Sequence, residues 1–397
     1  MTSSVQSPTS ADGDLARATA MLERLVAFDT TSRNSNLALI DDVRALLTEH
    51  GIQSDLVHND GGSKANLLAT IGPSVAGGVV LSGHTDVVPV DDQDWHTDPF
   101  KVTERDGKLY GRGTCDMKAF LAIVLAALPD MMRADLKIPL HLAFTYDEEV
   151  GCLGAPRLIR FLNANLPAPA AVIVGEPTEM KVVTAHKGIT RVRTTVTGHE
   201  AHSSRPHHGV SAVMVAAELI GYLQNMAAQI AQAGPFSDLF DPPHTTITVN
   251  RISGGTEVNI MAGHCTFEWD IRVLPEDDFD RYIRIFNAHC RSEVLPRLRK
   301  ISPTCNIESM QPSQTPSLKP LTPSAAEELC RKLTGDNVTR AVSFAAEAGQ
   351  FQASGLSTVI CGPGSITQAH QPNEFITIEQ LAAGTRFIRG LIAHASR

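Results

Sequence analysis

Three apolar runs that each lead into acidic or histidine side chains constrain the fold of this chain more than any other feature. A continuous apolar run of this kind predicts a strand buried on both faces, as in the parallel sheets of α/β proteins. The runs are residues 79–82, 140–146 and 170–174, and the polar residues that follow are His84 and Asp86, Glu148 and Glu149, and Glu176. Ligands bind outside the carboxyl ends of strands in such sheets. The pattern therefore predicts an α/β sheet with a polar site at one end.

Segments with helical periodicity alternate with these runs. Apolar residues recur at helical spacing over residues 15–28, over 37–50 and, after a glycine-rich loop, over 119–128. Three glycines let the loop turn tightly before it reaches Asp116. Two interpretations of Asp116 are open: a helix N-cap, as is common for Asp at a helix start, or a carboxylate brought into the same cleft as His84.

The alternation of helices with apolar strands that end in acidic residues stops after residue 186, and a similar alternation resumes near residue 313. Residues 187–312 predict the order strand, helix, strand, strand, helix, strand, which describes a self-contained four-stranded α+β domain. The predicted elements are 189–196, 209–227, 245–252, 265–273, 279–294 and 305–310, and a Pro- and Ser-rich return linker follows at 311–323. A helix at 325–334, a strand at 357–361 and a helix at 378–393 then resume the first pattern. We expect a catalytic domain made of residues 1–186 and 313–397, with residues 187–312 inserted into it.

Composition excludes several classes of function. The net charge of the 397 residues is −9 and no Lys/Arg block is present, which argues against nucleic acid as a partner. No apolar run approaches the roughly 18 residues that cross a membrane, and residues 1–13 lack the features of a secretory signal, so we expect a cytoplasmic protein. The seven cysteines are scattered and never form Cys-x-x-Cys, which argues against a thiolate zinc site. Any bound metal must therefore use histidine and carboxylate ligands.

Five residues placed after strands or at glycine-rich turns form a candidate ligand set: His84, Asp116, Glu149, Glu176 and His370. Two histidines and three carboxylates suit two zinc ions if one carboxylate is shared. Asp86 lies on the same side of its strand as His84, where its carboxylate can orient the imidazole ring. Glu148 points away from Glu149, so it stays free to act as a general base. Taken singly, each residue also has an ordinary structural explanation.

The same residues carry a resemblance to a known family. Its motifs are Ser-Gly-His84-Thr-Asp86, Gly-Arg-Gly-Thr-Cys-Asp116-Met-Lys, Asp-Glu148-Glu149-Val-Gly, Gly-Glu176-Pro-Thr and Ala-His370-Gln-Pro-Asn-Glu. From about residue 22 onward, the chain resembles the dinuclear zinc amidohydrolases that include acetylornithine deacetylase, succinyl-diaminopimelate desuccinylase, aminoacylase and carboxypeptidase G. The resemblance implies a mixed-sheet, zinc-exopeptidase-like catalytic domain with an inserted α+β lid. It also implies two zinc ions, for which cobalt substitutes, and a homodimer formed through the inserted domain.

The resemblance assigns roles to individual residues. It implies that one zinc ion is bound by His84, Asp116 and Glu176 and the other by Asp116, Glu149 and His370, with Asp86 behind His84 and Glu148 as the base. In the family, a histidine followed by serines crosses the dimer to hold the scissile carbonyl. His202 fits this role better than His199, and a histidine-rich surface loop is the other explanation of the segment.

Further residues resemble substrate contacts. Asn259 and Arg272 resemble contacts to a substrate carboxylate, for which a guanidinium offers paired donors; Arg272 has the alternative of an ordinary ion pair at a strand end. The segment around Glu347 and the one that contains Gly364 resemble acetylornithine deacetylases more than desuccinylases. We therefore expect Glu347 and Gly364 at the substrate site, with Glu347 near the substrate's side-chain amine. The alternative for Glu347 is that it only braces its loop.

The resemblance also narrows the reaction. A glutamate at position 176, where aminopeptidase relatives tend to have aspartate, disfavours an aminopeptidase. We predict hydrolysis of N2-acetylornithine to ornithine and acetate, a step of arginine biosynthesis. The alternatives are an acetylcitrulline deacetylase or succinyl-diaminopimelate desuccinylase, and a metal- or ligand-binding relative without turnover.

Overall fold

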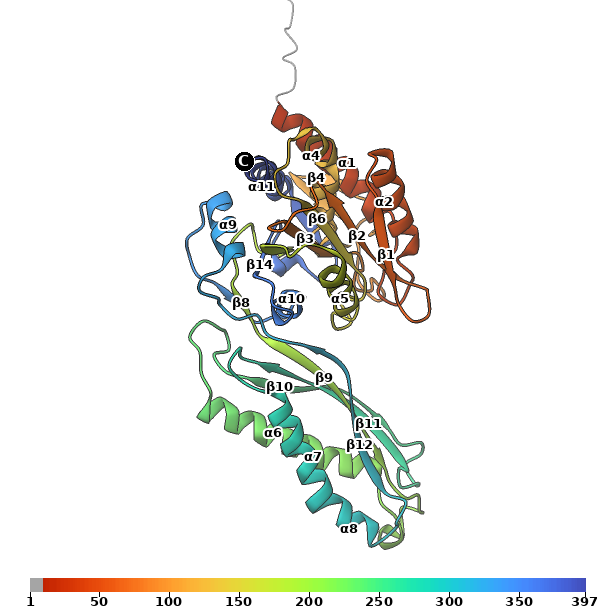
Figure 1. Cartoon of the computed structure of the whole chain (residues 1–397). Helices are drawn as coiled ribbons and strands as arrows, with labels where there is room; N and C mark the ends of the chain where they lie inside the picture. The colour runs from red at the N-terminus through yellow and green to blue at the C-terminus, as the bar shows by residue number, and fades with distance from the viewer. Residues whose placement is uncertain (1–9) are drawn as a thin grey trace, which may run out of the picture. The chain divides into compact units, whose positions relative to one another are not determined.

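The chain divides into two compact units, which are described separately here (Figure 1). The computed structural model describes residues 10–397. The first unit comprises Met1–Ala185, Leu318–Arg340 and Ala346–Arg397, and the second comprises His186–Ser317 and Ala341–Ala345. The segment expected as an insertion, residues 187–312, falls within the second unit, which continues to Ser317 and also includes residues 341–345.

A six-stranded mixed sheet lies at the centre of the first unit. Its order is β1-β2-β6-β3-β7-β14, and its strands are β1 (Ser54–His58), β2 (Ala65–Ile71), β3 (Val79–His84), β6 (Leu140–Thr145), β7 (Ala171–Pro177) and β14 (Thr358–Gly362). The last four strands in this order pair in parallel, whereas β2 pairs antiparallel with both β1 and β6. Every residue of β3, β6, β7 and β14 is buried, which is the physical reason for the continuous apolar runs in the sequence. The prediction of a mixed α/β sheet is confirmed.

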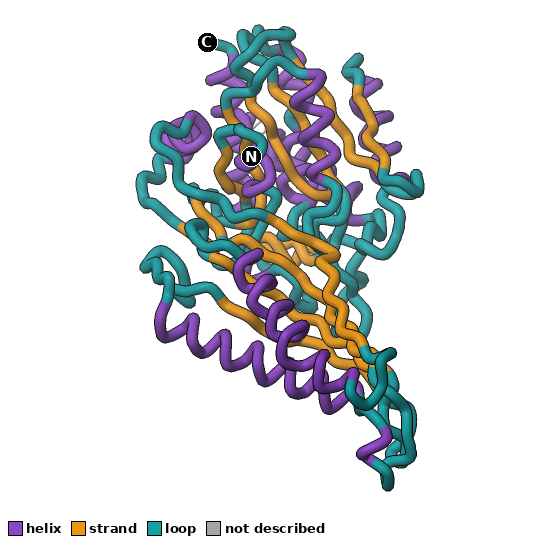
Figure 2. The backbone as a smooth tube through the Cα atoms, turned by 60° about the horizontal axis from the view of Figure 1, so that its bottom comes forward, coloured by secondary structure: helices purple, strands orange, loops and turns teal. Residues whose placement is uncertain are grey.

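Helices pack against this sheet and against one another (Figure 2). Helices α1 (Ser10–Val26), α3 (Lys118–Ala126) and α11 (Ile378–Ala395) contact one another, and α3 also contacts β3. Every residue of α3 is buried and all but Lys118 are apolar, so it is a core helix. The other helices of this unit are α2 (Leu37–Glu49), α4 (Leu128–Arg133), α5 (Ala155–Asn165), α9 (Ala325–Thr334) and α10 (Ala348–Ala353). A small sheet is formed by β4 (Thr103–Arg105), β5 (Lys108–Tyr110) and β15 (Phe375–Thr377).

The second unit is a four-stranded antiparallel sheet with helices on one face (Figures 1 and 2). The strand order is β10-β11-β9-β12, from β9 (Gly188–Thr197), β10 (Thr246–Gly254), β11 (His264–Val273) and β12 (Asn306–Thr315). The helices are α6 (Ala212–Ala233) and α7 (Phe279–His289). Their order along the chain confirms the predicted strand, helix, strand, strand, helix, strand arrangement. Two short strands, β8 (Ala185–His186) and β13 (Ala341–Val342), occur where the sequence passes from one unit to the other.

Three predicted boundaries in this unit are wrong. The helix expected over 279–294 ends as α7 at His289 and continues as a π-helical turn (Cys290–Val294) and then α8 (Leu295–Arg299). The first five residues of the expected linker 311–323 belong to strand β12, which ends at Thr315. The helix expected over 209–227 is α6, which runs from Ala212 to Ala233. It begins later than expected because Ser211 is its N-cap and accepts a hydrogen bond from the backbone N–H of Met214.

Membrane crossing requires a helix that is both long and strongly apolar. Among the residues that the structure describes, no helix meets both requirements.

Candidate metal centre

The parallel strands β3, β6 and β7 bring three of the predicted site segments to the same end of the central sheet. His84 is the last residue of β3 and pairs with Thr145 at the end of β6. Glu148 and Glu149 follow in the turn after β6, and Glu176 lies near the end of β7. Because β3 is parallel to both neighbours, the carboxyl ends of the three strands meet there.

Asp116 reaches this end of the sheet from the loop before α3. Its Oδ1 lies 3.0 Å from Nε2 of His84, and its Oδ2 lies 3.4 Å from Nε2 of His370. Met117, not Asp116, is the N-cap residue of α3, and no side chain caps this helix. The two oxygens of one carboxylate thus face two different histidines, which is the arrangement that a shared metal ligand requires.

The two remaining predicted ligands, Glu149 and Glu176, each lie beside one of these two histidines. Oε2 of Glu149 lies 2.9 Å from Nε2 of His370, and Oε1 of Glu176 lies 3.7 Å from Nε2 of His84. Two groups have all their ligand atoms within 4.8 Å of one another: His84, Asp116 and Glu149, and His84, Glu148 and Glu176. The structure thus brings the five predicted ligands together, and it places Glu148, predicted as a base, within the same cluster.

Burial and mutual charge perturb these groups in the way that a cation site produces. Burial, reinforced by the charge of Asp116, raises the pKa of Glu149 to about 8 and raises the pKa of Glu176 well above its usual value. For Asp116, burial alone would raise the pKa, but hydrogen bonds from His370 and His84 outweigh it and hold the pKa below the usual range. Divalent cations stabilise buried carboxylates that repel one another in this way. Two imidazoles and three carboxylates therefore fit a pair of divalent cations.

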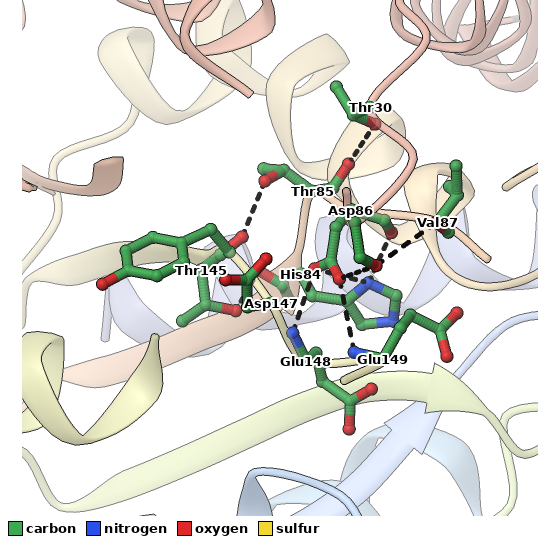
Figure 3. A network of polar contacts seen from close by, with 12 residues as sticks. Thr30, His84, Thr85, Asp86, Val87, Thr145, Asp147, Glu148 and Glu149 are labelled. Carbon is green, nitrogen blue, oxygen red and sulfur yellow. Dashed lines mark hydrogen bonds and ion pairs between the residues drawn. The ribbon is translucent and has the colours of Figure 1, made fainter. Parts of the chain in front are cut away.

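The carboxylate of Asp86 holds the turn after β6, which differs from the prediction that it orients the ring of His84 (Figure 3). Its Oδ1 accepts a hydrogen bond from the backbone N–H of Glu148 at 3.1 Å, and its Oδ2 accepts from that of Glu149 at 3.3 Å. Oδ2 also accepts from the hydroxyl of Ser32 at 2.7 Å. The Asp86 side chain thereby fixes the two glutamates that carry the predicted chemistry.

The ring of His84 is oriented through the main chain. Its Nδ1 lies 2.8 Å from the backbone oxygen of Asp86, whereas the nearest carboxylate oxygen of Asp86 is 3.7 Å away. A carbonyl oxygen only accepts hydrogen bonds, so Nδ1 carries the proton. If a cation took the place of the proton between Nε2 and Asp116, the lone pair of Nε2 would be available to bind it.

A buried ion pair that was given no role in the sequence analysis holds the loop of Asp116. Oε1 of Glu374 accepts from the backbone N–H groups of Cys115 at 2.8 Å and Asp116 at 3.0 Å. Oε2 accepts from the backbone N–H of Gly113 at 3.0 Å and from the guanidinium of Arg112 at 2.7 Å. The side chains of Arg112 and Glu374 are both 1% exposed. The one sequence signal for this role is that Glu374 closes the motif that contains His370.

The loop of His370 is held by a second set of contacts that the sequence did not reveal. His370 has a φ of +64°, a left-handed conformation that costs a non-glycine residue about 1 kcal/mol or more. The side-chain amide of Gln93 donates to the backbone oxygen of His370 at 3.0 Å. Asn373 accepts from the backbone N–H of His96 at 2.8 Å and donates to the backbone oxygen of Asp94 at 3.1 Å. These bonds tie the loop of His370 to the loop that follows β3.

Glu347 and Gly364, which we expected at the substrate site, are a buried acid and a glycine with a left-handed backbone. Glu347 is only 1% exposed, and burial raises its pKa to about 7. Its backbone oxygen accepts from the N–H of Gln350 at 2.9 Å at the start of α10. Its contact with a substrate amine stays a prediction. Gly364 has a φ of +90°, and an added Cβ would lie 2.7 Å from Sγ of Cys115. Backbone geometry thus explains this glycine.

The other predicted substrate residues all lie in the second unit. His202 is exposed, and its Nδ1 lies 2.8 Å from the hydroxyl of Ser204. The backbone N–H of Ser203 donates to the backbone oxygen of Asn259 at 2.9 Å, so the segments of His202 and Asn259 are neighbours.

Arg272 stands on β11 with a second cation nearby. It pairs across the sheet with Thr246 of β10 and Ile189 of β9. Burial, together with the charge of Arg272, lowers the pKa of Lys187 to about 8. The ammonium of Lys187 itself donates to the backbone oxygens of Pro242 at 2.8 Å and His244 at 2.7 Å.

Comparison with known proteins decides the family. A sequence profile described as peptidase family M20/M25/M40 matches residues 80–394, which include all five predicted ligands. The chain belongs to this family. Two curated members of similar sequence are both called acetylornithine deacetylase. The one from Pasteurella multocida is 34% identical over 366 residues, covering 90% of this chain and 93% of the relative. The one from Myxococcus xanthus is 33% identical over 380 residues, covering 94% and 96%.

Solved structures of M20-type enzymes have the same fold. An M20 family metallo-carboxypeptidase from Sulfolobus solfataricus superposes with a TM-score of 0.75 at 16% identity, covering 96% of this chain and 99% of the other. Aminopeptidase PepT from Bacillus cereus gives a TM-score of 0.71 at 19% identity, with coverage of 96% and 99%. The predicted fold, a catalytic domain with an inserted α+β domain, is confirmed. Membership of the M20 family makes the protein a metal-dependent amidohydrolase.

Proposed function

We propose that the protein hydrolyses the amide bond of N2-acetylornithine to give ornithine and acetate. The observation that carries this proposal is the convergence of two histidines and three buried carboxylates at one end of the central sheet. The substrate follows from the curated relatives called acetylornithine deacetylase, which match this chain over most of its length.

In this proposal the cations are shared among the five ligands in two sets. His84, Asp116 and Glu176 hold one, and Asp116, Glu149 and His370 hold the other. When bound, two divalent cations polarise the scissile carbonyl and make water acidic enough to attack near neutral pH. Zinc suits a ligand set of imidazoles and carboxylates, and cobalt accepts the same donors. The placement of the two Asp116 oxygens, each beside a different histidine, supports this division.

The side chains of the protein supply the proton transfer. Glu148 takes a proton from the attacking water and delivers it to the leaving nitrogen. Burial, opposed by the charge of His84, raises the pKa of Glu148 to about 7. Asp86 holds the turn that presents Glu148.

The family resemblance supports roles in substrate binding for residues of the second unit. His202 stabilises the negative charge that develops on the carbonyl oxygen, a role that an exposed imidazole can perform as a hydrogen-bond donor. Asn259 and Arg272 bind the carboxylate of the amino acid, for which the guanidinium offers paired donors. Gly364 contributes backbone to the substrate site.

We also propose a homodimer formed through the second unit. Strand β10 lies at the edge of its sheet, and no strand among residues 10–397 pairs with its outer side. Met214 of α6 is 73% exposed and Ile252 of β10 is 50% exposed. A free strand edge beside exposed apolar side chains is typical of an association surface. Sedimentation at micromolar concentration tests this directly, and a monomer would contradict it.

A cytoplasmic location and a place in arginine biosynthesis complete the proposal. All seven cysteines are buried thiols, as is usual for proteins of a reducing compartment. The proposed product, ornithine, is a precursor of arginine, which is the reason for the assignment to that pathway.

The experiment that tests the function is release of free amine from matched substrates. The zinc-loaded protein is given acetylornithine, acetylcitrulline, acetylmethionine and succinyl-diaminopimelate at equal concentrations. We expect the highest kcat/KM for acetylornithine. A preference for the succinyl substrate would overturn the substrate assignment, and no hydrolysis of any substrate would overturn the activity itself.

A charge-removing variant of the base tests the proton transfer. Glu148→Gln is expected to bind both cations but to lose at least about 100-fold in kcat, because general acid–base catalysis contributes about 10²–10⁴-fold. Glu49→Gln, the same change at an exposed helix position, is the control. Full turnover by a cation-loaded Glu148→Gln protein would show that another group is the base.

A further inference from the structure

The carboxylate of Glu148 has a thiol as its neighbour, and the catalytic scheme above does not use this group. Sγ of Cys152 lies 3.2 Å from Oε1 of Glu148, within the distance of a hydrogen bond to sulfur. Cys152 is 3% exposed, so water competes little for this contact. Among residues 10–397, the Glu148 carboxylate has no hydrogen bond other than this one.

The turn after β6 places the thiol there. The backbone N–H groups of Gly151 and Cys152 both donate to the backbone oxygen of Glu148, at 2.9 Å and 2.8 Å, which folds the chain back over that residue. The N–H of Leu153 donates to the backbone oxygen of Asp147 at 3.0 Å, and Cys152 has a φ of +54°. The chain reverses so tightly that the side chain of Cys152 returns to the glutamate four residues earlier.

A second element holds the backbone of Cys152 from outside the turn. The side-chain amide of Gln350, on α10, donates to the backbone oxygen of Cys152 at 3.1 Å. Gln350 is itself only 9% exposed. The Cys152 side chain has a single heavy atom beyond Cβ, so fixing the backbone from two sides limits Sγ to its staggered rotamers.

We propose that Cys152 is a positioning residue for Glu148, an inference that rests on the proposed role of Glu148 as the base. The S–H group donates to Oε1 and holds the plane of the carboxylate, which leaves Oε2 for the proton that moves during hydrolysis. A thiol is a weak donor, so it orients the carboxylate with little loss of basicity. Rotational freedom in a base lowers the fraction of molecules in reactive geometry, and small misplacements of a catalytic group cost large factors in rate.

Two substitutions separate the donor from the volume of the side chain. Cys152→Ser keeps a hydrogen-bond donor, and Cys152→Ala removes it; both have to adopt the same positive φ. Cys290→Ala is the control, because Cys290 is also 3% exposed and lies in the second unit. For each protein, kcat, KM, bound metal and melting temperature are measured with acetylornithine as substrate.

The expected result is a change confined to kcat. Cys152→Ala should lower kcat about tenfold, equivalent to about 1.4 kcal/mol, at unchanged KM and unchanged metal content. Cys152→Ser should retain most of the rate, and Cys290→Ala should retain all of it. In a Glu148→Gln background, adding Cys152→Ala should change the residual rate less than twofold, because the thiol acts through the glutamate.

Three outcomes would overturn the proposal. If Cys152→Ala keeps the wild-type kcat, the thiol does not position the base. If Cys152→Ala lowers metal content, or lowers the residual rate of Glu148→Gln by the same factor as in the wild type, its role is purely structural. Absence of hydrolysis by the wild-type protein would instead overturn the proposed function and this inference together, so the two failures are distinguishable.

Discussion

Replacing Glu374 by glutamine should loosen the metal centre without touching any predicted ligand. Four donors converge on the Glu374 carboxylate, two on each oxygen. Glutamine keeps one oxygen and turns an NH₂ group toward the other two donors, so two hydrogen bonds are lost. A hydrogen bond to a charged group contributes about 1.5–3 kcal/mol, which gives a loss of about 3–6 kcal/mol. This agrees with about 3–5 kcal/mol for breaking a buried ion pair.

The loss should appear in metal affinity as well as in stability. Two of the four donors are the backbone N–H groups of Asp116 and its neighbour Cys115, so the shared ligand loses its support. Groups that orient metal ligands typically contribute 10–100-fold to metal affinity. We therefore expect Glu374→Gln to bind the cations at least about tenfold more weakly, measured by competition with a chromophoric chelator.

The control is the same substitution at Glu379, which is exposed in the first turn of α11. Glu379→Gln should change the free energy of unfolding by less than about 0.5 kcal/mol and leave metal affinity unchanged. The reasoning is refuted if Glu374→Gln unfolds at the same denaturant concentration as the wild type and binds cations equally well.

Three further predictions concern other parts of the first unit. Burial lowers the pKa of His141 from 6.5 to about 4, so protonation favours the unfolded chain; the free energy of unfolding should fall by up to about 3 kcal/mol as the pH drops from 6.5 to 4. Denaturant titrations at a series of pH values should show that the free energy of unfolding of His141→Gln falls less steeply with decreasing pH than that of the wild type. Equal pH dependence in the two proteins would contradict this role of His141. Asp86→Asn should lower kcat about tenfold or more at unchanged fold, because an amide supplies one acceptor oxygen where the carboxylate supplies two; steady-state kinetics and circular dichroism check this, and wild-type kcat would be the contrary result. Gly175→Ala should destabilise by about 1–3 kcal/mol, because its Cβ would lie 2.1 Å from the ring of Phe120; thermal melting measures the loss, and failure of Phe120→Leu to restore part of it would argue against the steric cause.

The part of the site that lies on buried strands could be predicted from the sequence. Continuous burial forces an unbroken apolar run, and the first polar residues after such a run must lie at the strand end. His84, Glu149 and Glu176 were placed by this reasoning, and the parallel pairing of β3 with β6 and β7 brings them together. The inserted α+β pattern was readable for a related reason, since half-buried strands and amphipathic helices have distinct periods.

The parts that could not be predicted depend on turn geometry and on contacts between distant loops. Whether the carboxylate or the backbone of Asp86 meets His84 is decided by the bend after β3, which has no periodic signal. The role of Glu374 depends on backbone N–H groups, which every non-proline residue carries and which no sequence pattern distinguishes. Glu347 was expected near a substrate amine from the family resemblance of its segment, and its burial follows from packing that only the folded chain reveals.

Titration of the metal-free protein with zinc is the most direct test of hydrolysis by two bound cations. Bound zinc and release of ornithine from acetylornithine are followed in the same samples. We predict no turnover before zinc is added, full turnover at two ions per chain, and, for Glu148→Gln, binding of both ions with kcat at least about 100-fold lower. Hydrolysis by the metal-free protein, or no hydrolysis by the fully loaded one, would contradict it.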